Sequence, residues 1–503
     1  MHRLRSLPLM VVLMAIGAVA MYIPAAHALA TRQHEIARPF FYGGTVFLLL
    51  VAMIGIATAN RPSRPAAQGH LGTLVASYLV LPLMFAVPFE QAVPSTGFTD
   101  AWFEMISSFT TTGATLFGEP GRLPPSVHLW RALVGWLGGF YVLVAAVAVL
   151  APLSLGGVEV ISGKVPGRGN AAQITRIADP SERMLRHATL LFPAYAGLTG
   201  MLWVLLLLAG DNGLTAICHA MSTLSTSGIS PSGGLSGSQS GFMGELMIFI
   251  FLFAAVSRRL MPGALMVDRS TRIGRDPEVQ LAAFLLIGVP LVLFLRHWIG
   301  AIETEEVQNL GAGGQAMWGG LFTTLSFLTT TGFESRSWAS SQDWSGLGTP
   351  GLILLGLAIV GGGVATTAGG VKLLRVYALY RHAERELERI VHPSSIGGKG
   401  PVARRLRREG AYVAWIFFML FAFSIAVVTA ALTLTGLQFE PAMVLTIAAL
   451  TTTGPLAAMA VETPIGWQEL DAAAKLIAAA AMVLGRMETL AILALLAPAS
   501  WRR

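Results

Sequence analysis

Long apolar runs separated by short polar stretches fill most of this 503-residue chain. At least ten of the runs approach the roughly 20 residues that an α-helix needs to cross a bilayer. The predicted spans are residues 8–28, 39–58, 71–92, 127–154, 186–209, 241–266, 279–299, 347–380, 411–435 and 470–496. Hydrophobic residues make up 54% of the chain and charged residues only 12%. The pattern therefore predicts an all-α, polytopic membrane protein with about ten transmembrane spans.

Four shorter amphipathic segments lie between the long runs. Residues 99–109 have apolar side chains at helical spacing but are too few to cross a membrane. Residues 212–224, 314–328 and 439–450 occupy the same place between later runs. Each segment is predicted to be a half-helix that enters the membrane and stops. Because non-helical backbone at membrane depth must be packed in protein or face water, four such segments predict a shared aqueous path.

A tetrapeptide rich in Thr and Ser and ending in glycine follows each predicted half-helix. The four copies are Thr110-Thr111-Thr112-Gly113, Ser225-Thr226-Ser227-Gly228, Thr329-Thr330-Thr331-Gly332 and Thr451-Thr452-Thr453-Gly454. Their glycines are 115, 104 and 122 residues apart, which indicates a fourfold internal repeat. A single copy would be explained by close packing of small residues. Four equivalent copies instead favour a filter, because a bare cation needs a ring of oxygens in place of its hydration shell.

The repeat predicts two leading helices and four helix, pore-loop, helix units around one pore. The predicted divisions are 1–66 for the leading helices and 67–155, 156–268, 269–400 and 401–503 for the units, with a glycine-rich intramembrane break at 361–370. The first apolar run could instead be a cleaved signal, because Ala26-His27-Ala28 resembles a small-residue cleavage site. Its apolar core is long enough for a full span, so a retained helix is favoured.

Basic residues gather in alternate loops. If every span crosses the membrane, 26 of the 34 Lys and Arg residues fall on one side, and the positive-inside tendency makes that side cytoplasmic. Both termini are therefore predicted inside and all four tetrapeptides toward the outside. The net charge of +7 is thus a topology signal, and no nucleic-acid partner is expected. The longest basic segment, 381–408, is predicted to be a solvated helix with local ion pairs followed by a basic cluster. The cluster is either a lipid-headgroup anchor or, together with the 155–187 loop, a docking site for a cytosolic partner.

Signals for an enzyme are poor. Gly167-Arg168-Gly169 with Ala172 is a broken dinucleotide-binding string with no preceding strand. The ten histidines show no paired metal-ligand spacing, and the single cysteine, Cys218, excludes an intramolecular disulfide. The chain is therefore not expected to be an enzyme or to hold an organic cofactor. Any nucleotide sensing must come from another chain.

Further motifs extend the pattern from about residue 70 to the end. They are Phe98-Thr99-Asp100-Ala101-Trp102-Phe103-Glu104 before the first tetrapeptide, Trp130-Arg131-Ala132-Leu133 with Trp136-Leu137-Gly138-Gly139, the run from Gly361 to Lys372, His392-Pro393, and Gly485-Arg486-Met487-Glu488. Together with the tetrapeptides they resemble the membrane subunits of the Trk/Ktr/HKT superfamily of potassium transporters. The two leading helices favour its TrkH branch over its KtrB branch.

The resemblance implies potassium uptake across a bacterial inner membrane, with potassium as the transported ion. It implies a filter of Thr111, Thr112, Gly113, Thr226, Ser227, Gly228, Thr330, Thr331, Gly332, Thr452, Thr453 and Gly454. It also implies a homodimer and a cytosolic, nucleotide-binding regulatory subunit of the RCK type, similar to TrkA. Glycine at all four filter positions favours potassium, because serine at the first marks sodium-preferring relatives. Ser227 and Ile229 make the second tetrapeptide region the most divergent in sequence.

The glycine-rich break has two interpretations. Small residues could serve close helix packing, or the segment could be an unwound gate under the filter, as the resemblance also suggests. The gate residues would be Gly361, Gly362, Gly363, Thr366, Thr367, Gly369, Gly370 and, from the last span, Arg486. Arg486 could instead form an ion pair with Glu488 or another carboxylate. Lys372 and Arg375 are expected to be interface anchors or partner contacts.

Two other functions remain open at the sequence level. A proton- or sodium-coupled symporter would need a titratable group on the path, and the candidates are Glu104, His219, Glu440 and Glu488. Capping or packing explains Glu104 and Glu440 equally well. A polytopic membrane enzyme or receptor is a more distant alternative, because the sequence has neither a clustered catalytic set nor a large soluble domain.

Overall fold

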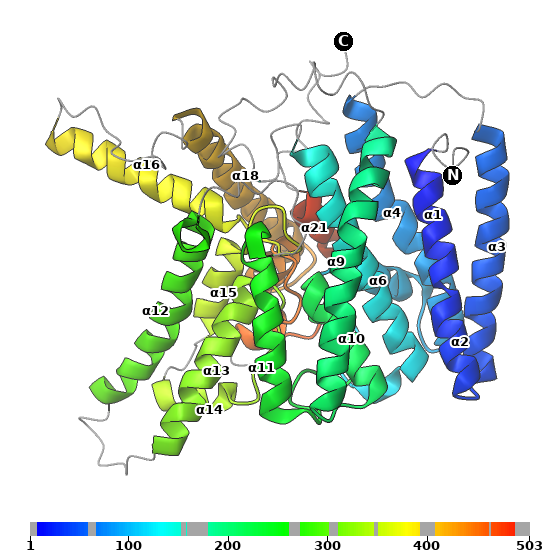
Figure 1. Ribbon diagram of the computed structural model, residues 1–503, viewed down its shortest axis with the longest axis horizontal. Coiled ribbons are helices and arrows are strands. Elements are labelled where there is room, and N and C mark those ends of the chain that lie inside the picture. The colour runs from blue at the N-terminus through cyan, green and yellow to red at the C-terminus, as the bar shows by residue number, and fades with distance from the viewer. Residues whose placement is uncertain are drawn as a thin grey trace.

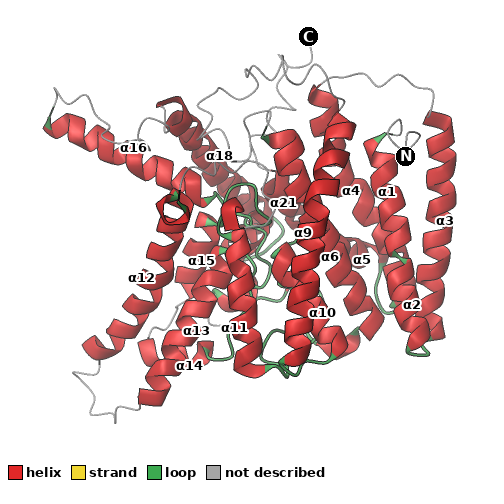
Figure 2. Ribbon diagram, in the orientation of Figure 1, coloured by secondary structure: helices red, strands yellow, loops and turns green. Residues whose placement is uncertain are grey.

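A computed structural model describes residues 8–58, 67–151, 157, 180–260, 272–300, 310–346, 351–392, 408–461 and 464–487. Every regular element in these ranges is a helix, as the sequence predicts (Figure 2). The long helices run in roughly one direction through the molecule, and shorter helices and loops fill its middle (Figure 1). This arrangement is that of a polytopic membrane protein.

The N-terminal helices form one edge of the molecule (Figure 1). They are α1 (Leu9–Ala20), α2 (Tyr22–Ala30), which continues α1 after one residue, and α3 (His34–Thr58). Phe40 of α3 packs edge-on against Trp130, whose other neighbour is Phe85. This aromatic cluster attaches the leading helices to the part of the chain that follows.

The order long helix, half-helix, second helix then occurs four times. The first set is α4 (Ala67–Ala92), α5 (Phe98–Phe109) and α6 (Pro125–Ala145), which continues as the π-helical turn η3 (Ala146–Leu150). The second is α9 (Pro180–Leu208), α10 (Gly213–Ser225) and α11 (Gly241–Leu252). The third is α12 (Pro277–Gly300), α13 (Leu310–Leu328), the short α14 (Trp338–Ser345), α15 (Gly351–Val360) and α16 (Leu373–Val391). The fourth is α18 (Arg408–Thr433), α19 (Phe439–Leu450), the short α20 (Leu456–Met459) and α21 (Ala472–Met487).

Single 3₁₀ turns lie between these helices. They are η2 (Pro120–Arg122), η4 (Phe253–Ala255), η5 (Arg258–Leu260), η6 (Ile273–Arg275) and η7 (Trp467–Glu469). Seven helical segments of the described chain are long and apolar enough to cross a bilayer. They are Leu9–Ala30, His34–Thr58, Gly72–Ala92, Pro125–Leu150, Arg183–Leu208, Pro277–Arg296 and Gly410–Thr433. The other three predicted runs contain the shorter helices α11, α15 and α21.

The four sets are arranged in a closed cycle. The second helix of each set packs against the half-helix of the next: α6 against α10, α11 against α13, and α15 against α19. The last of these helices, α21, packs against the first half-helix, α5, and so completes the cycle. Most residues of the half-helices are therefore buried.

One helix departs from the common direction. α16 lies across the end of the molecule, on the side opposite the N-terminal helices (Figure 1). Its outer part carries the predicted local ion pairs, between Arg381 and Glu384 and between Arg389 and Glu386. The expectation of a solvated helix is therefore confirmed for this part. The basic cluster that follows lies almost entirely outside the described residues.

Candidate functional site

Each tetrapeptide begins where its half-helix ends, and all four share one unusual backbone conformation. The second residue has a positive φ in every copy: 56° at Thr111, 54° at Thr226, 56° at Thr330 and 55° at Thr452. A residue with a Cβ in this left-handed region costs of order 1–3 kcal/mol, and such residues cluster at functional sites. The glycine that ends the tetrapeptide also has a positive φ in the first three copies, where Gly113, Gly228 and Gly332 lie at 72°, 63° and 80°.

Backbone hydrogen bonds hold this conformation. The amide of the third residue donates to the carbonyl five residues earlier in all four copies, which is the bond that closes a Schellman-type helix end. The pairs are Thr112 to Ser107 (2.8 Å), Ser227 to Ser222 (3.0 Å), Thr331 to Ser326 (2.8 Å) and Thr453 to Ala448 (2.8 Å). Each tetrapeptide is thus a defined termination of its half-helix.

Side-chain hydroxyls fasten the first and third residues. The hydroxyl of Thr110 donates to the carbonyl of Ile106 (2.8 Å) and contacts the hydroxyl of Thr112 (2.8 Å). The same two contacts recur in the other copies, for Thr329, Thr451 and Ser225. Each hydroxyl donates to the carbonyl four residues earlier and contacts the hydroxyl two residues later. Serine therefore replaces threonine in the second copy without loss of the hydrogen bonds. The hydroxyls link each tetrapeptide to its half-helix.

The four tetrapeptides touch one another in cyclic order. A Cβ atom added to Gly113 would overlap the carbonyl oxygen of Ser227, and one added to Gly228 would overlap the carbonyl of Thr331. A Cβ on Gly332 would lie 2.9 Å from the ring of Pro455, beside the fourth glycine. The cycle closes because the amide of Gly454 donates to the carbonyl of Thr112 at 2.6 Å. The spacing of the four loops therefore depends on the absence of side chains at these positions.

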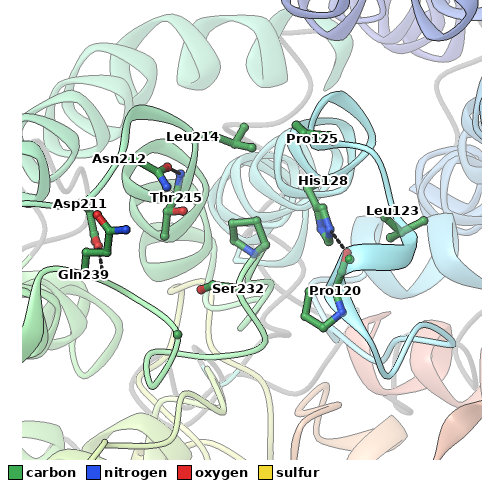
Figure 3. A pocket seen from close by; sticks show the side chains of 13 residues that line it. Pro120, Leu123, Pro125, His128, Asp211, Asn212, Leu214, Thr215, Ser232 and Gln239 are labelled. Atoms are coloured by element: carbon green, nitrogen blue, oxygen red, sulfur yellow. Dashed lines mark hydrogen bonds between the residues drawn. The ribbon is translucent and has the colours of Figure 1, made fainter. Parts of the chain in front are cut away.

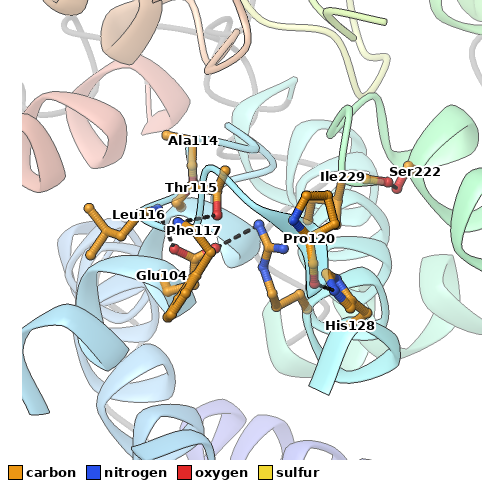
Figure 4. Close-up of polar contacts among 11 residues, drawn as sticks. Glu104, Ala114, Thr115, Leu116, Phe117, Pro120, His128, Ser222 and Ile229 are labelled. Atoms are coloured by element: carbon orange, nitrogen blue, oxygen red, sulfur yellow. Dashed lines mark hydrogen bonds and ion pairs between the residues drawn. The ribbon is translucent and has the colours of Figure 1, made fainter. Parts of the chain in front are cut away.

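A polar side chain nine residues before the glycine anchors the outgoing chain in three of the loops. Glu104 accepts a hydrogen bond from the amide of Leu116 (3.1 Å) and pairs with Arg131 at 2.6 Å (Figure 4). At the equivalent positions, His219 bonds the hydroxyl of Ser230 (2.8 Å), and Thr323 accepts from the amide of Ser335 (3.4 Å). These contacts fix the chain as it leaves the tetrapeptide.

The fourth loop departs most in structure, not the second. Leu445 occupies its anchoring position, and Gly454 is the one tetrapeptide glycine without a positive φ. The indole of Trp467 donates to the carbonyl of Gly454 (3.2 Å) and replaces the missing anchor. In the second loop, by contrast, Ile229 accepts from Ser222 as Ala114 accepts from Ser107. The divergence expected at the second loop is therefore one of side chains and not of backbone.

The chain between α15 and α16 is a loop, since residues 361–372 are not helical. The loop touches three of the four tetrapeptide regions. Thr367 donates to the carbonyl of Leu224 (3.1 Å), and the amide of Gly369 donates to the hydroxyl of Thr330 (2.7 Å). A Cβ on Gly369 would also overlap the carbonyl of Thr451. The glycine-rich loop thus lies directly against the half-helix ends, with its threonines buried.

Lys372 and Arg375 do not lie at the surface, so their expected role as interface anchors is wrong. Lys372 donates to the carbonyl of Ala368 within the glycine-rich loop, and only 8% of the residue is exposed. Arg375 is fully buried, with its guanidinium 3.6 Å from the ring centroid of Phe417 in α18. Such a cation–π contact favours a buried guanidinium. Both residues support the loop from within.

Arg486 lies in α21 at the level of the half-helix ends. The neighbouring Gly485 is packed so closely on the carbonyl of Leu450 that a Cβ would overlap it. Arg486 is buried beside the phenols of Tyr78 and Tyr195 and, among the described residues, forms no ion pair. Its alternative partner Glu488 lies outside the described residues. The guanidinium is therefore an uncompensated buried charge within the described part of the chain.

The remaining titratable candidates occupy different environments. Glu104 and His219 are buried and engaged in the anchoring contacts, whereas Glu440 is exposed near the start of α19. Cys218 is buried with a free thiol. The described residues contain no cluster of three or more His, Cys, Asp or Glu side chains that could hold a metal ion. The string at 167–172 lies outside the described residues.

A cavity of about 420 Å³ lies apart from the tetrapeptides. It is bounded by the turn around Pro120, the start of α6 with His128, and the start of α10 with Asp211 and Asn212 (Figure 3). None of the tetrapeptide residues lines it. The cavity therefore does not mark the path suggested by the four loops.

Comparisons with known proteins agree with this architecture. The chain is 29% identical to the Trk system potassium uptake protein TrkH of Vibrio parahaemolyticus over 497 residues, 97% of each protein. It is 28% identical to TrkH of Escherichia coli K12 over 464 residues, 91% of each. The crystal structure of the potassium transporter TrkH from Vibrio parahaemolyticus superimposes with a TM-score of 0.80 at 26% identity, over 99% of this chain and all of that one.

The motif resemblance is thereby confirmed at the level of the family. The model of the family described as "TrkH: Cation transport protein" matches residues 37–255 and 278–503. The relatives are named as uptake proteins and not as enzymes, in agreement with the expectation from the sequence. This chain belongs to the TrkH family of cation transport proteins.

Proposed function

We propose that this protein mediates potassium uptake through a filter formed by the four tetrapeptides. The main support is that the four tetrapeptides contact one another in a closed cycle. Each loop contacts the next at a glycine or, for the third and fourth loops, at Pro455 beside Gly454. The relatives of similar length are named potassium uptake proteins, which supports potassium as the cargo. The filter residues are those expected from the sequence: Thr111, Thr112, Gly113, Thr226, Ser227, Gly228, Thr330, Thr331, Gly332, Thr452, Thr453 and Gly454.

The chemistry of such a filter follows from its backbone. Carbonyl oxygens around a narrow path can replace the hydration shell of a dehydrated cation. The C-terminal ends of α5, α10, α13 and α19 all meet at the tetrapeptides, and their partial negative charges favour a cation there. The hydroxyl and amide hydrogen bonds behind each tetrapeptide keep the oxygens at fixed spacing. Selectivity for potassium then rests on the glycines that set how closely the loops approach.

The glycine-rich loop is proposed to be the gate of this path. Its residues Gly361, Gly362, Gly363, Thr366, Thr367, Gly369 and Gly370 lie in a segment that contacts the second, third and fourth tetrapeptide regions. The loop has few helical hydrogen bonds to lose, so it can move without unfolding α15 or α16. Arg486 is proposed to limit cation occupancy next to the filter, because its buried positive charge repels a nearby cation.

The cellular arrangement is also proposed. Both termini are cytoplasmic in a bacterial inner membrane, as the distribution of basic loops favours. The relatives' names place them in a Trk system. The working assembly is proposed to be a homodimer with a cytosolic, nucleotide-binding RCK-type subunit similar to TrkA. Membrane lipid is the other partner.

Coupled symport remains the competing mechanism, and the geometry favours it less. The carboxylate of Glu104 is committed to Arg131 and to the amide of Leu116, and His219 is committed to Ser230. A proton on Glu104 would weaken its ion pair and so a loop anchor, which leaves Nδ1 of His219 as the one open position on these two side chains. A reversal potential that follows the potassium gradient alone, at varied pH and sodium, supports the channel mechanism. A potential that shifts with pH or sodium supports symport.

The proposed function is tested by flux measurements on purified protein in liposomes. Wild-type protein should take up rubidium or potassium with little competition from sodium. Gly113→Ser should lose this selectivity, because the added side chain displaces the carbonyl of Ser227. Gly97→Ser is the matched control, since no atom lies within 4 Å of a Cβ at Gly97. Sodium-insensitive uptake by both variants would contradict the filter assignment.

A further inference from the structure

The glycine-rich loop is held on a second side, by residues that are not part of the filter. The amide of Gly363 donates to the carbonyl of Ala255 at 3.0 Å. The amide of the next residue, Val364, donates to the carboxylate of Glu278 at 2.7 Å. Glu278 is the second residue of α12, and 3% of it is exposed. A buried carboxylate from a distant helix therefore accepts a backbone amide in the middle of the loop.

Glu278 is itself fixed by the corner that joins α11 to α12. Its amide donates to the carboxylate of Asp276 at 3.1 Å. The same carboxylate accepts from the hydroxyl of Ser257 (3.1 Å) and pairs with Arg259 (3.1 Å). Ser257 and Arg259 follow η4, and Asp276 precedes α12. The two ends of the connection between α11 and α12 are thus joined to each other and, through Glu278, to the loop.

From these contacts we infer that Glu278 is a positioning residue that latches the glycine-rich loop against the filter. The inference rests on the proposed function, in which this loop is the gate. The carboxylate stabilises the loop position seen here. Movement of the corner around Asp276 takes the carboxylate away from the amide of Val364. The corner lies between two predicted cytoplasmic ends of helices, where a cytosolic partner could act on it.

The amide of Val364 has different surroundings in the two positions of the loop, packed against the filter and moved away from it. Val364 is fully buried, so its amide needs an acceptor when the loop packs against the filter. Once the loop moves away, the amide can bond to water, and the carboxylate no longer contributes. Removing the acceptor therefore destabilises only the latched state and shifts the population toward the released one.

The test compares three variants at this position in full-length protein reconstituted in liposomes without a regulatory subunit. Glu278→Ala removes the acceptor and should raise basal potassium flux on the order of tenfold. Glu278→Gln keeps an oxygen at the same reach and should stay near wild type. Glu278→Asp keeps the charge but withdraws it by one carbon, and should raise the flux by a smaller factor. Glu278→Asp also tests the latch if the Glu278→Ala protein does not fold.

Thr199→Val is the matched control. It removes a buried acceptor, the hydroxyl bound by Trp136 at 2.9 Å, in a contact between α6 and α9 that includes no residue of the loop, and should leave basal flux unchanged. The potassium-to-sodium ratio should be the same in all variants, because the filter is untouched. Wild-type flux in both Glu278→Ala and Glu278→Asp would overturn the latch. Absence of selective flux in the wild type would instead overturn the proposed function.

A labelling experiment reads the loop position independently of flux. In a Cys218→Ala background the chain has no other cysteine, so Ala365→Cys gives a single thiol in the loop. Ala365 is 7% exposed, and its positive φ imposes the same strain on cysteine as on alanine. A water-soluble thiol reagent should modify this site faster, on the order of tenfold, when Glu278→Ala is added. Equal rates with and without the Glu278→Ala substitution would contradict the inference.

Discussion

At the residue scale, the second position of each tetrapeptide carries the clearest signature. Four threonines adopt a left-handed conformation that threonine disfavours, at φ values within a few degrees of one another. Such strain persists only where the surrounding structure fixes it. Here the amide of the next residue and the hydroxyls on either side supply that constraint in every copy. The backbone at these positions is therefore built to a common shape.

The ion pair of Glu104 and Arg131 gives a stability prediction at the same scale. Glu104→Gln should lower the free energy of unfolding by about 3–5 kcal/mol, because it leaves the Arg131 charge buried without its partner. Glu104→Gln combined with Arg131→Met should recover most of the loss. Thermal unfolding in detergent measures both variants. A single variant as stable as the wild type would show that the pair contributes little.

Individual residues show where sequence reasoning reaches its limit. The tetrapeptides could be recognised, because they depend on local sequence alone. The burial of Lys372 and Arg375 could not, since it depends on α18 packing over the start of α16. The structural departure of the fourth loop was also missed. Its local signals are Pro455 directly after the glycine, and Leu445 and Ala448, which occupy positions that are polar in the other three loops.

At the element scale, the half-helices are the best predicted feature. The sequence pattern placed them within one residue of α5, α10 and α19, because each has a short apolar run closed by a tetrapeptide. The start of α13 was placed four residues too late. The polar helix α14 (Trp338–Ser345) was not predicted, since it has no apolar periodicity. It packs against α12 and α13 and is therefore specified by tertiary contacts.

The loop between α15 and α16 provides the prediction for this scale. Deletion of residues 364–368 removes the hydrogen bond of Thr367 to Leu224 and the contact of Ala368 with Lys372. The path should then conduct constitutively, with several-fold higher basal flux in liposomes. Thr366→Ser keeps the hydroxyl that bonds Gly363 and is the control. Unchanged and still regulated flux after the deletion would show that the loop is not the gate.

At the scale of the whole molecule, the fourfold cycle explains why one chain can form a closed path. Each second helix supports the half-helix of the following set, and α21 returns to α5. The fourfold repeat could be predicted from the tetrapeptides. The order of contacts could not, because the spacing of the repeats does not determine which helices pack against each other. The same cycle brings Gly485 and Arg486 to the level of the half-helix ends.

The orientation of the molecule is predicted by its basic loops. In a Cys218→Ala background, Leu387→Cys on α16 should react with a membrane-impermeant maleimide only from the cytoplasmic side. Gln239→Cys, after the second tetrapeptide, should react only from the outside. Labelling of intact cells and of inverted vesicles distinguishes the two. Reaction of both residues from one side would contradict the topology.

The central claim is that the four tetrapeptides together form the cation site, and the most direct measurement locates the ion. Crystals or vitrified particles prepared in rubidium or thallium should show ion density on the axis enclosed by the tetrapeptides, near the carbonyls of Thr112, Ser227, Thr331 and Thr453. The density should weaken when sodium replaces these ions. Ion density confined to other parts of the molecule, such as the cavity beside His128 and Asp211, would contradict the account.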